Sequence, residues 1–579
     1  MTNEQLPEQA SFLVADCGSM NTRVVLFDVV EGVYRFIAGA NAPTTKEPPW
    51  SNIMKGIQHA ITRISDITGR PLLDEHGQLI TPVKSNGAGI DQFGATVSAA
   101  PALKCLLIGL VESISVDSSR ATMLNTLADE VDFITLLNDD PDEELIQRIV
   151  DLSPDIIFIA GGTEHGADYR VLKMAEIASL ATHMLAGINQ PQIIYAGNSQ
   201  LQPDIKDIFG AEVAVTFADN IRPTLNREEL ADASRHLTEI YNKRQLGRVG
   251  GIKDLNGWCR IPMQDTPTAF SKIVQYFAAQ ENSHVMGVDL GSESVTIIQA
   301  SPEKLRLGIR SDLGVGRPIK NILNHATPYE IRKWIPAKVT DTDVRDFLYN
   351  KSLRPQTVPT TEESMQMEQA CARAILNETR QSVLKHWYQN KKTSFPPFSR
   401  LLARGSALTN ASRPVQTILM LLDALQPQGL FSVSLDTHGV LPALGLISQR
   451  QPLLAVQALE GGVLTDLGWV LAPATNLPPG EKIMSVKITT ASIRDLDLDN
   501  VTQGSIEVIP IPPGQEATID IQPVSSVDIG FGSGKGKKFR IQGGAVGLVI
   551  DGRGRPLNLP TDEEKRHEII SQWFWDTGA

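Results

Sequence analysis

Two short segments of this 579-residue chain contain the residue types that bind phosphate groups and metal ions. They are "DCGSMNTR", residues 16–23, and "DLGSESVT", residues 289–296. In each segment an apolar run ends in an Asp-x-Gly-Ser turn, and a second apolar run follows. A glycine turn between strands exposes backbone N–H groups at one point, and such a nest binds phosphate oxygens. A carboxylate would repel phosphate, so we expect the aspartate to hold Mg²⁺ through water.

Residue type suggests a role for each position of the two turns. Asp16 and Asp289 are the predicted metal ligands. Gly18 and Gly291 allow phosphate to approach closely, since neither has a Cβ atom. The other predicted phosphate contacts are Ser19, Asn21, Thr22, Arg23, Ser292 and Ser294. A single turn of this kind is most often an ordinary hairpin turn. Two with the same flanks favour a cleft that holds a nucleoside triphosphate with Mg²⁺ between two lobes.

A third segment, "RGSALTN", residues 404–410, follows an apolar run and precedes a predicted helix. A glycine at the start of a helix can accept adenosine without a side-chain clash, so Gly405 and Ser406 are predicted to border the adenosine. Glycine turns between a strand and a helix are common in α/β folds. The position of this one, after both phosphate-like turns, is what makes it informative.

The elements that must position these residues can be read from the hydrophobic pattern. Strand-like and helical segments alternate between about 120 and 220, which predicts a parallel sheet covered by helices on both faces. Residues 225–280 are predicted to be largely helical, and residues 361–390 form a long amphipathic helix. From about 455 onward, β-branched residues alternate and turn formers are frequent, which predicts an all-β domain that ends in a short helix near 562–575.

The predicted fold class is α/β, with two lobes, an inserted doubly wound subdomain and a C-terminal all-β domain. Five regions follow from the pattern. They are a first lobe (10–118), the inserted subdomain (119–225), a helical connection (226–283), a second lobe (284–454) and the β-rich domain (455–579).

Composition excludes several classes of protein. The net charge of −13 argues against a nucleic-acid-binding protein, which would need a basic face, and it disfavours docking on an anionic membrane. No apolar stretch reaches the length of a membrane-spanning helix, and the polar start of the chain does not resemble a secretion signal. The four cysteines are far apart, so structural zinc and disulfides are not expected and a cytoplasmic location fits.

The three turns, in this order, resemble the nucleotide motifs of the actin, Hsp70 and sugar-kinase superfamily, with a ribonuclease H-like fold in each lobe. "FIAGGTEHG" (158–166), "IIYAGN" (193–198) and "LDTHGVLPALGLIS" (435–448) resemble the glutamate mutase L, or MutL-like, family. The resemblance implies an ATP-binding accessory or chaperone-like protein with Mg²⁺ as cofactor and a cobalamin-dependent mutase as partner. It covers roughly residues 10–450.

One departure from the family pattern concerns hydrolysis. The second phosphate motif of the family has two adjacent glycines, two threonines and an acid, where this chain has residues 292–297, "SESVTI". Glu293 therefore either positions water as a base or marks a degenerate site. Glu293, Asp16 and Asp289 form the predicted catalytic set of an ATPase. The departure from the family motif bears on ATP hydrolysis more than on ATP binding. Two alternatives remain: an actin-like scaffold that forms homo-oligomers, and a small-molecule kinase of the same fold.

Two other glycine-rich segments have features of binding sites. Residues 161–166, "GGTEHG", end one predicted strand, and Asn198 ends the next, so the same sheet edge could bind a small molecule or a partner. An ordinary capped glycine turn explains them equally well. Residues 530–540, "GFGSGKGKKFR", lack the spacing of a P-loop, and a basic hairpin loop is the better interpretation.

Overall fold

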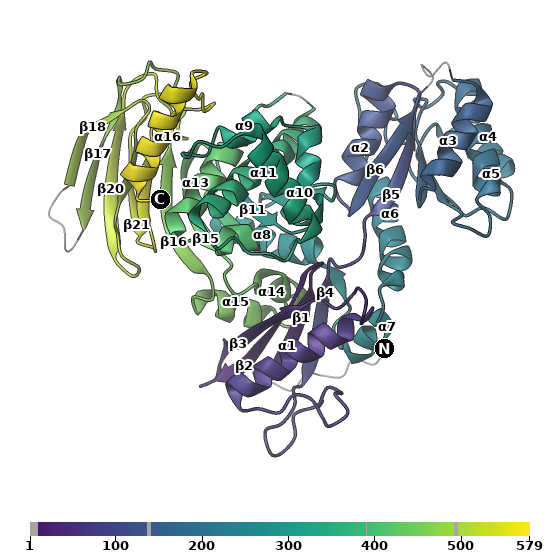
Figure 1. Cartoon of the computed structure of the whole chain (residues 1–579), viewed down its shortest axis with the longest axis horizontal. Helices are drawn as coiled ribbons and strands as arrows, with labels where there is room; N and C mark the ends of the chain where they lie inside the picture. Colours follow the sequence, from purple (N-terminus) through teal and green to yellow (C-terminus); the bar gives the residue numbers. More distant parts are fainter. Residues whose placement is uncertain (1–9, 136–139, 390, 491–495) are drawn as a thin grey trace.

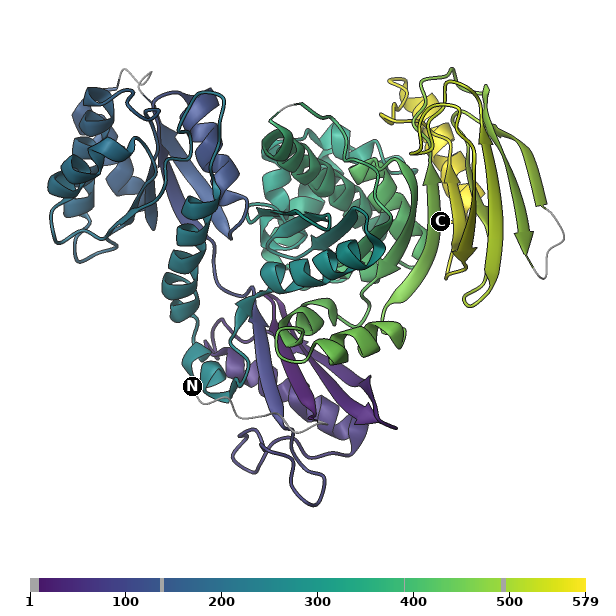
Figure 2. The same cartoon turned by 180° about the vertical axis from the view of Figure 1, so that it is seen from behind.

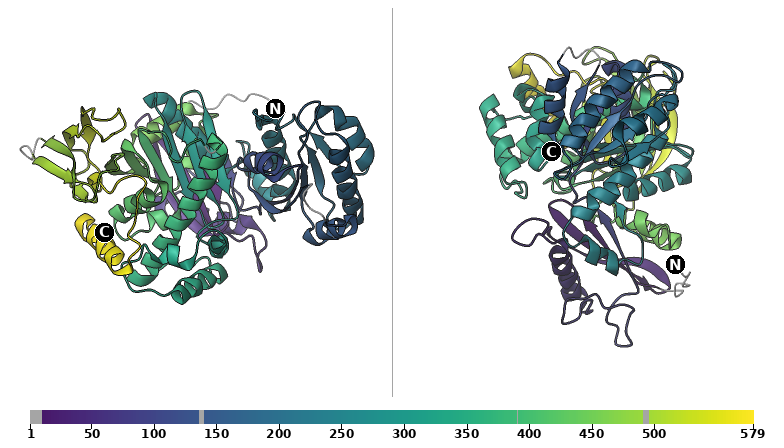
Figure 3. Two further views of the ribbon diagram at one scale, coloured as in Figure 1. Left: turned by 90° about the horizontal axis from the view of Figure 1, so that it is seen from above. Right: turned by 90° about the vertical axis from the view of Figure 1, so that its right-hand side faces the viewer.

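A computed structural model describes residues 10–135, 140–389, 391–490 and 496–579 of the chain. It has two lobes, an inserted subdomain and a C-terminal β sheet (Figure 1). The view from behind shows the same arrangement, with the first lobe below the others (Figure 2). From above, the inserted subdomain and the C-terminal sheet stand at opposite ends of the molecule (Figure 3).

The first lobe is a five-stranded sheet with strand order β10-β4-β1-β2-β3. Strands β1, β2 and β3 form an antiparallel meander, and β4 and β10 add to it in parallel with β1. Helices α1 and α7 pack beside this sheet. The elements are β1 (Phe12–Cys17), β2 (Asn21–Val30), β3 (Val33–Pro43), α1 (Ile53–Thr68), β4 (Gln92–Val97), α7 (Ile252–Trp258) and β10 (Gln264–Asp265).

The second lobe repeats this arrangement. Its eight-stranded sheet has the order β13-β12-β11-β14-β15-β16-β22-β19, and the first five strands have the same order and directions as those of the first lobe. The chain thus contains an internal duplication, which is the two-lobed arrangement that the resemblance implied. These five strands are β11 (Val285–Leu290), β12 (Val295–Ala300), β13 (Leu305–Arg310), β14 (Arg400–Arg404) and β15 (Gly429–Leu435).

Helices cross between the lobes and join them. Helix α8 follows the first sheet but packs on strands β11 and β12 of the second, whereas α14 follows strand β15 of the second sheet and packs on β4 and β1 of the first. The two helices also pack on each other. The helices of this region are α8 (Thr266–Glu281), α9 (Pro328–Arg332), α10 (Asp341–Leu353), α11 (Glu362–Tyr388), α12 (Ser406–Thr409), α13 (Pro414–Leu425), α14 (Leu441–Ile447) and α15 (Pro452–Glu460).

The inserted subdomain is a parallel sheet in the order β6-β5-β7-β8-β9, with helices on both faces. This is the predicted doubly wound arrangement. Strand β5 opens this sheet although it precedes the predicted boundary at residue 118, and α6 leads the chain back to the first lobe. The elements are β5 (Leu103–Ile108), α2 (Asp117–Met123), β6 (Ala128–Ile134), α3 (Asp142–Leu152), β7 (Ile156–Ile159), α4 (Tyr169–Met184), β8 (Gln192–Tyr195), α5 (Gln202–Phe209), β9 (Val215–Phe217) and α6 (Ala231–Arg244).

The C-terminal region is divided between two sheets. Strands β16 (Thr465–Ala472), β19 (Ile506–Ile509) and β22 (Gly547–Asp551) extend the sheet of the second lobe past the predicted boundary at residue 455. A separate antiparallel sheet packs against them, and the chain ends in α16 (Glu563–Thr577), close to the predicted helix. This second sheet contains β17 (Lys482–Thr490), β18 (Leu496–Thr502), β20 (Glu516–Pro523) and β21 (Lys537–Gln542). Across the described ranges, no helix is both long and apolar enough to cross a membrane.

Candidate functional site

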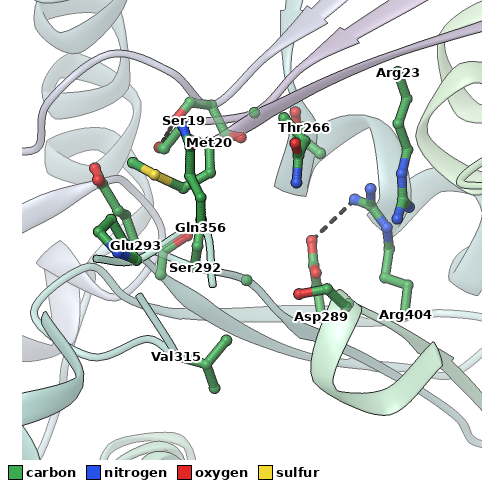
Figure 4. A pocket seen from close by; sticks show the side chains of 18 of the residues that line it. Ser19, Met20, Arg23, Thr266, Asp289, Ser292, Glu293, Val315, Gln356 and Arg404 are labelled. Carbon is green, nitrogen blue, oxygen red and sulfur yellow. Dashed lines mark hydrogen bonds and ion pairs between the residues drawn. The ribbon is translucent and has the colours of Figure 1, made fainter. Parts of the chain in front are cut away.

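The two Asp-x-Gly-Ser turns line one pocket between the lobes (Figure 4). The first turn joins β1 to β2, and the second joins β11 to β12. Nearly all of the residues that the sequence singled out are among those lining this pocket. They are Asp16, Gly18, Ser19, Asn21, Arg23, Asp289, Gly291, Ser292, Glu293, Ser294, Gly405 and Ser406. The structure therefore brings together segments that lie almost 300 residues apart in the sequence.

The backbone of the two turns is the same. The N–H group of Gly18 donates to the carbonyl of Asn21 at 3.1 Å, and that of Gly291 donates to Ser294 at 3.0 Å. A Cβ atom on either glycine would lie 2.8 or 2.7 Å from the same acceptor oxygen, so both turns need glycine for close approach of the backbone.

Each turn presents backbone donors to the pocket. In the described part of the chain, the N–H groups of Ser19 and Met20, and those of Ser292 and Glu293, have no hydrogen-bond acceptor. These residues line the pocket. The four donors have no acceptor within the described part of the protein, as a phosphate-binding nest requires, and phosphate binding by these turns stays a prediction.

Thr22 is the exception among the predicted phosphate contacts. Its side chain is fully buried, and its hydroxyl bonds to that of Thr44 at 2.9 Å. The Thr44 hydroxyl in turn donates to the carbonyl of Gly18 at 2.8 Å. Thr22 is directed away from the pocket because alternate residues of β2 face opposite sides of the sheet. In this structure Thr22 stabilises the turn through Thr44, on the side of the sheet that faces away from the pocket.

Gly405 stands at the end of β14, at the beginning of α12, with a φ of 115°. A Cβ atom at this position would lie 2.1 Å from the carbonyl oxygen of Leu290. The glycine is thus required by the packing of this turn on β11 as well as by its positive φ. Gly405 and Ser406 border the same pocket as the two phosphate-like turns, where adenosine was predicted.

The main feature that the sequence analysis missed is Arg404, the last residue of β14. Its guanidinium donates to Asp289 Oδ2 at 2.9 Å and to Asp16 Oδ2 at 2.8 Å, so that it joins the carboxylates of the two lobes. Figure 4 shows Arg404 beside Asp289, with Arg23 next to it. A charged residue at the end of a buried apolar strand, "RLLAR", was the available signal for a functional arginine.

Burial strongly affects the pKa values of Arg404 and Asp289. Arg404 is only 5% exposed. Burial lowers the pKa of its guanidinium, but the carboxylates of Asp289 and Asp16 outweigh this effect and leave the pKa raised. Burial also raises the pKa of Asp289, while Arg404 acts in the opposite direction. The guanidinium is therefore charged at every physiological pH and neutralises part of the acidic cluster.

The residues do not fit the predicted magnesium site. Asp16 Oδ1 accepts hydrogen bonds from the hydroxyls of Thr96 and Thr266, both at 2.8 Å, and Oδ2 accepts one from Arg404. Asp289 shares the same guanidinium. Among the residues that the structure describes, no three His, Cys, Asp or Glu side chains form a group that could hold a metal ion. The metal role of Asp16 and Asp289 thus remains a prediction that these contacts disfavour.

Glu293 is held between cations from two sides. Its carboxylate lies 3.5 Å from Lys46 Nζ of the first lobe and 3.7 Å from an Arg317 nitrogen. Lys46 also donates to the carbonyl of Ala99 at 3.0 Å. Glu293 therefore contributes an ion pair across the cleft, and its role as a base stays a prediction.

The "GGTEHG" turn of the inserted subdomain bonds to its own surroundings. Glu164 accepts hydrogen bonds from the Ser199 hydroxyl at 2.5 Å and from the Asn220 amide at 2.7 Å. Asn198 caps the short helical turn that follows it by accepting from the N–H of Gln200. These contacts match the capped-turn interpretation of this segment.

The duplicated sheets and the cleft between them define a two-lobed protein of the actin-like fold. A family model described as MutL protein matches residues 12–462, and the chain belongs to this family. A comparison with curated proteins found no match.

Several solved structures are similar to this chain. Nucleotide-free acetone carboxylase has a TM-score of 0.30 at 10% identity, over 85% of this chain and 81% of that chain. Component A of the (R)-2-hydroxyglutaryl-CoA dehydratase of Acidaminococcus fermentans has a TM-score of 0.27 at 8% identity, over 76% of this chain and 96% of that chain. The nucleotide-free diol dehydratase-reactivating factor has a TM-score of 0.31 at 9% identity, over 78% of this chain and 99% of that chain. Likenesses at this level establish neither a shared ligand nor a shared activity.

Proposed function

We propose that this chain is an ATP-binding accessory protein that serves a cobalamin-dependent mutase. The observation that carries the nucleotide part is the shared pocket: two glycine turns, one from each lobe, present unpaired backbone N–H groups to the same space. The mutase part is supported by membership of the MutL protein family. Asp16, Asp289 and Glu293 remain the candidates for hydrolysis.

Nucleotide binding has a physical route to a partner protein through the inserted subdomain. This subdomain is continuous with the first lobe and also contacts the second. Ile309 donates its N–H to the carbonyl of Leu124 at 2.7 Å, and Ser311 donates to Asp129 at 2.5 Å. On the surface, Lys385 pairs with Asp117 at 3.1 Å. A change in the angle between the lobes would therefore move the inserted subdomain, as in hinge-type switches.

Calorimetric titration with ATP tests the nucleotide part. Arg23 lines the pocket, so Arg23→Met is expected to weaken binding by roughly tenfold, about the value of one charged contact. Arg35→Met is the matched control, because Arg35 lies exposed on β3 of the same lobe. Equal affinities in wild type and Arg23→Met would contradict the assignment of the site.

The accessory role needs a separate test with the partner. A cobalamin-dependent mutase from the same organism would be allowed to inactivate during turnover and then incubated with this chain and ATP. We expect activity to return only when both are present, and phosphate release measured in parallel would show whether ATP is hydrolysed. No return of activity in any combination would contradict the accessory role and leave ATP binding as a separate result.

A further inference from the structure

Arg404 stands where the predicted metal ion was expected. It ends β14, and in the parallel pairing of β14 with β11 it lies directly beside Asp289. From there its guanidinium reaches the opposite lobe and bonds to Asp16. One side chain thus bridges the two carboxylates that were expected to face a divalent cation.

The carboxylates of Asp16 and Asp436 accept several hydrogen bonds within the protein, whereas Asp289 accepts one among the residues described, from Arg404. Asp16 accepts three hydrogen bonds, two from hydroxyls and one from Arg404. Asp436, whose Oδ2 lies 4.0 Å from Arg404 Nε, accepts the N–H groups of Val440 and Leu441 at 2.8 and 2.9 Å. Mg²⁺ needs about six oxygen ligands in a nearly octahedral arrangement. A planar guanidinium needs only two oxygens at the spacing found here.

We infer that the guanidinium of Arg404 replaces the divalent cation of this site, and that the chain binds its nucleotide without a metal ion. The inference rests on the proposed function, because it concerns the same pocket. The fixed positive charge offsets the repulsion between phosphate and the aspartates, which is the task that a bound metal ion would otherwise perform.

A second cation is available to contact the phosphates themselves. Arg23 lines the pocket, and in the described ranges no carboxylate forms an ion pair with it. Its guanidinium packs against the turn at Gly439, where an added Cβ atom would lie 2.7 Å from it. Arg23 and Arg404 both line the pocket, and Figure 4 labels the two side chains. Arg404 neutralises the aspartates, and Arg23 together with the N–H groups of the two turns faces the ligand.

Titration of the full chain with ATP, once with magnesium chloride and once with EDTA, tests the inference. We expect the two affinities to agree within about threefold. Binding with magnesium that weakens by about tenfold or more in EDTA would overturn the inference and leave the proposed function intact. Absence of binding in both buffers would overturn the proposed function, and the inference with it, so the two failures are distinguishable.

Variants of Arg404 sharpen the result. Arg404→Lys keeps the positive charge and is expected to bind ATP equally in both buffers. Arg404→Met frees two carboxylates, so ATP binding in EDTA should fall by roughly tenfold and magnesium should restore it. Arg400→Met is the control, since Arg400 lies on the same strand and pairs with Glu281 at 2.6 Å outside the pocket. Arg404→Met that binds like wild type in both buffers would overturn the inference. If this variant does not fold, the EDTA comparison on wild type and Arg404→Lys still decides.

Discussion

The turns of the first and second lobes have the same backbone, but at three of the equivalent positions only one of the two side chains is charged. Asp16 and Asp289, 273 residues apart, begin the two turns, and the glycine that follows each makes the same hydrogen bond. Across the antiparallel pair, Arg23 lies beside Asp16 where Thr296 lies beside Asp289. Across the parallel pair, Thr96 stands where Arg404 stands in the second lobe.

The third difference lies at the tip of each turn, where Met20 of the first lobe corresponds to Glu293 of the second. The comparison teaches that a duplicated backbone supplies two similar anion-binding turns, while single substitutions divide the charges between them. The first lobe contributes an arginine that faces the pocket, and the second contributes the arginine that joins the lobes.

The largest expected effect concerns the residue that pairs in parallel with the aspartate of each turn, Arg404 in the second lobe and Thr96 in the first. Arg404→Met leaves buried carboxylates without their cation and is expected to destabilise the protein by about 3–5 kcal/mol. Thr96→Val removes one hydrogen bond to Asp16 and is expected to cost about 1.5 kcal/mol. Urea unfolding of both variants, followed by tryptophan fluorescence, checks this order. Equal losses would show that the two positions are not as different as their contacts indicate.

The glycines should behave alike. Gly18→Ala and Gly291→Ala each introduce a Cβ atom within 3 Å of a carbonyl oxygen, so each is expected to cost about 1–3 kcal/mol and to weaken ATP binding. Gly257→Ala is the control, because a Cβ atom there meets nothing within 4 Å and alanine favours the helix. Thermal unfolding and calorimetry provide the measurements. A marked effect in only one turn would break the equivalence of the two lobes.

The ionisation of Asp289 predicts a pH dependence. Because burial raises its folded-state pKa above the ordinary value of 3.8, the folded protein binds a proton at a pH where the unfolded chain has released it. This group therefore contributes stability that is fully present below pH 3.8 and is lost as the pH rises through the folded-state pKa. Asp289→Asn should lack this contribution, so its melting temperature should vary less with pH in that window. If the melting temperatures of variant and wild type changed with pH in the same way, Asp289 would not make this contribution.

The smallest effect is expected at the tips of the turns. Glu293→Met gives the second turn the residue that the first has at Met20. Because the carboxylate is partly exposed and its ion pairs are long, the expected loss of stability is at most about 1 kcal/mol. ATP affinity should rise, since a negative charge is removed from the pocket. Unchanged affinity with slower phosphate release would instead support Glu293 as the base.

Much of the fold could be predicted because its signals are local. Apolar runs, glycine turns and amphipathic spacing are properties of neighbouring residues, and they predicted the parallel sheet of the inserted subdomain and helices close to α11 and α16. The course of the sheets was harder to predict. Strands β16 and β22 join the second lobe although a domain boundary at residue 455 was predicted, since pairing between distant strands leaves no trace in local composition.

Within the site, the pattern of residues by itself determined which turns could bind phosphate, because the spacing of aspartate, glycine and hydroxyl residues is a property of one short segment. Only the tertiary structure decided what surrounds them. Arg404 lies beside Asp289 through the pairing of β14 with β11, and it meets Asp16 because the two lobes pack against each other. Thr22 faces away from the pocket through the alternation of β2. The physical reason is that charge neutralisation in a buried cleft depends on which side chains converge there, and convergence follows from packing between segments hundreds of residues apart.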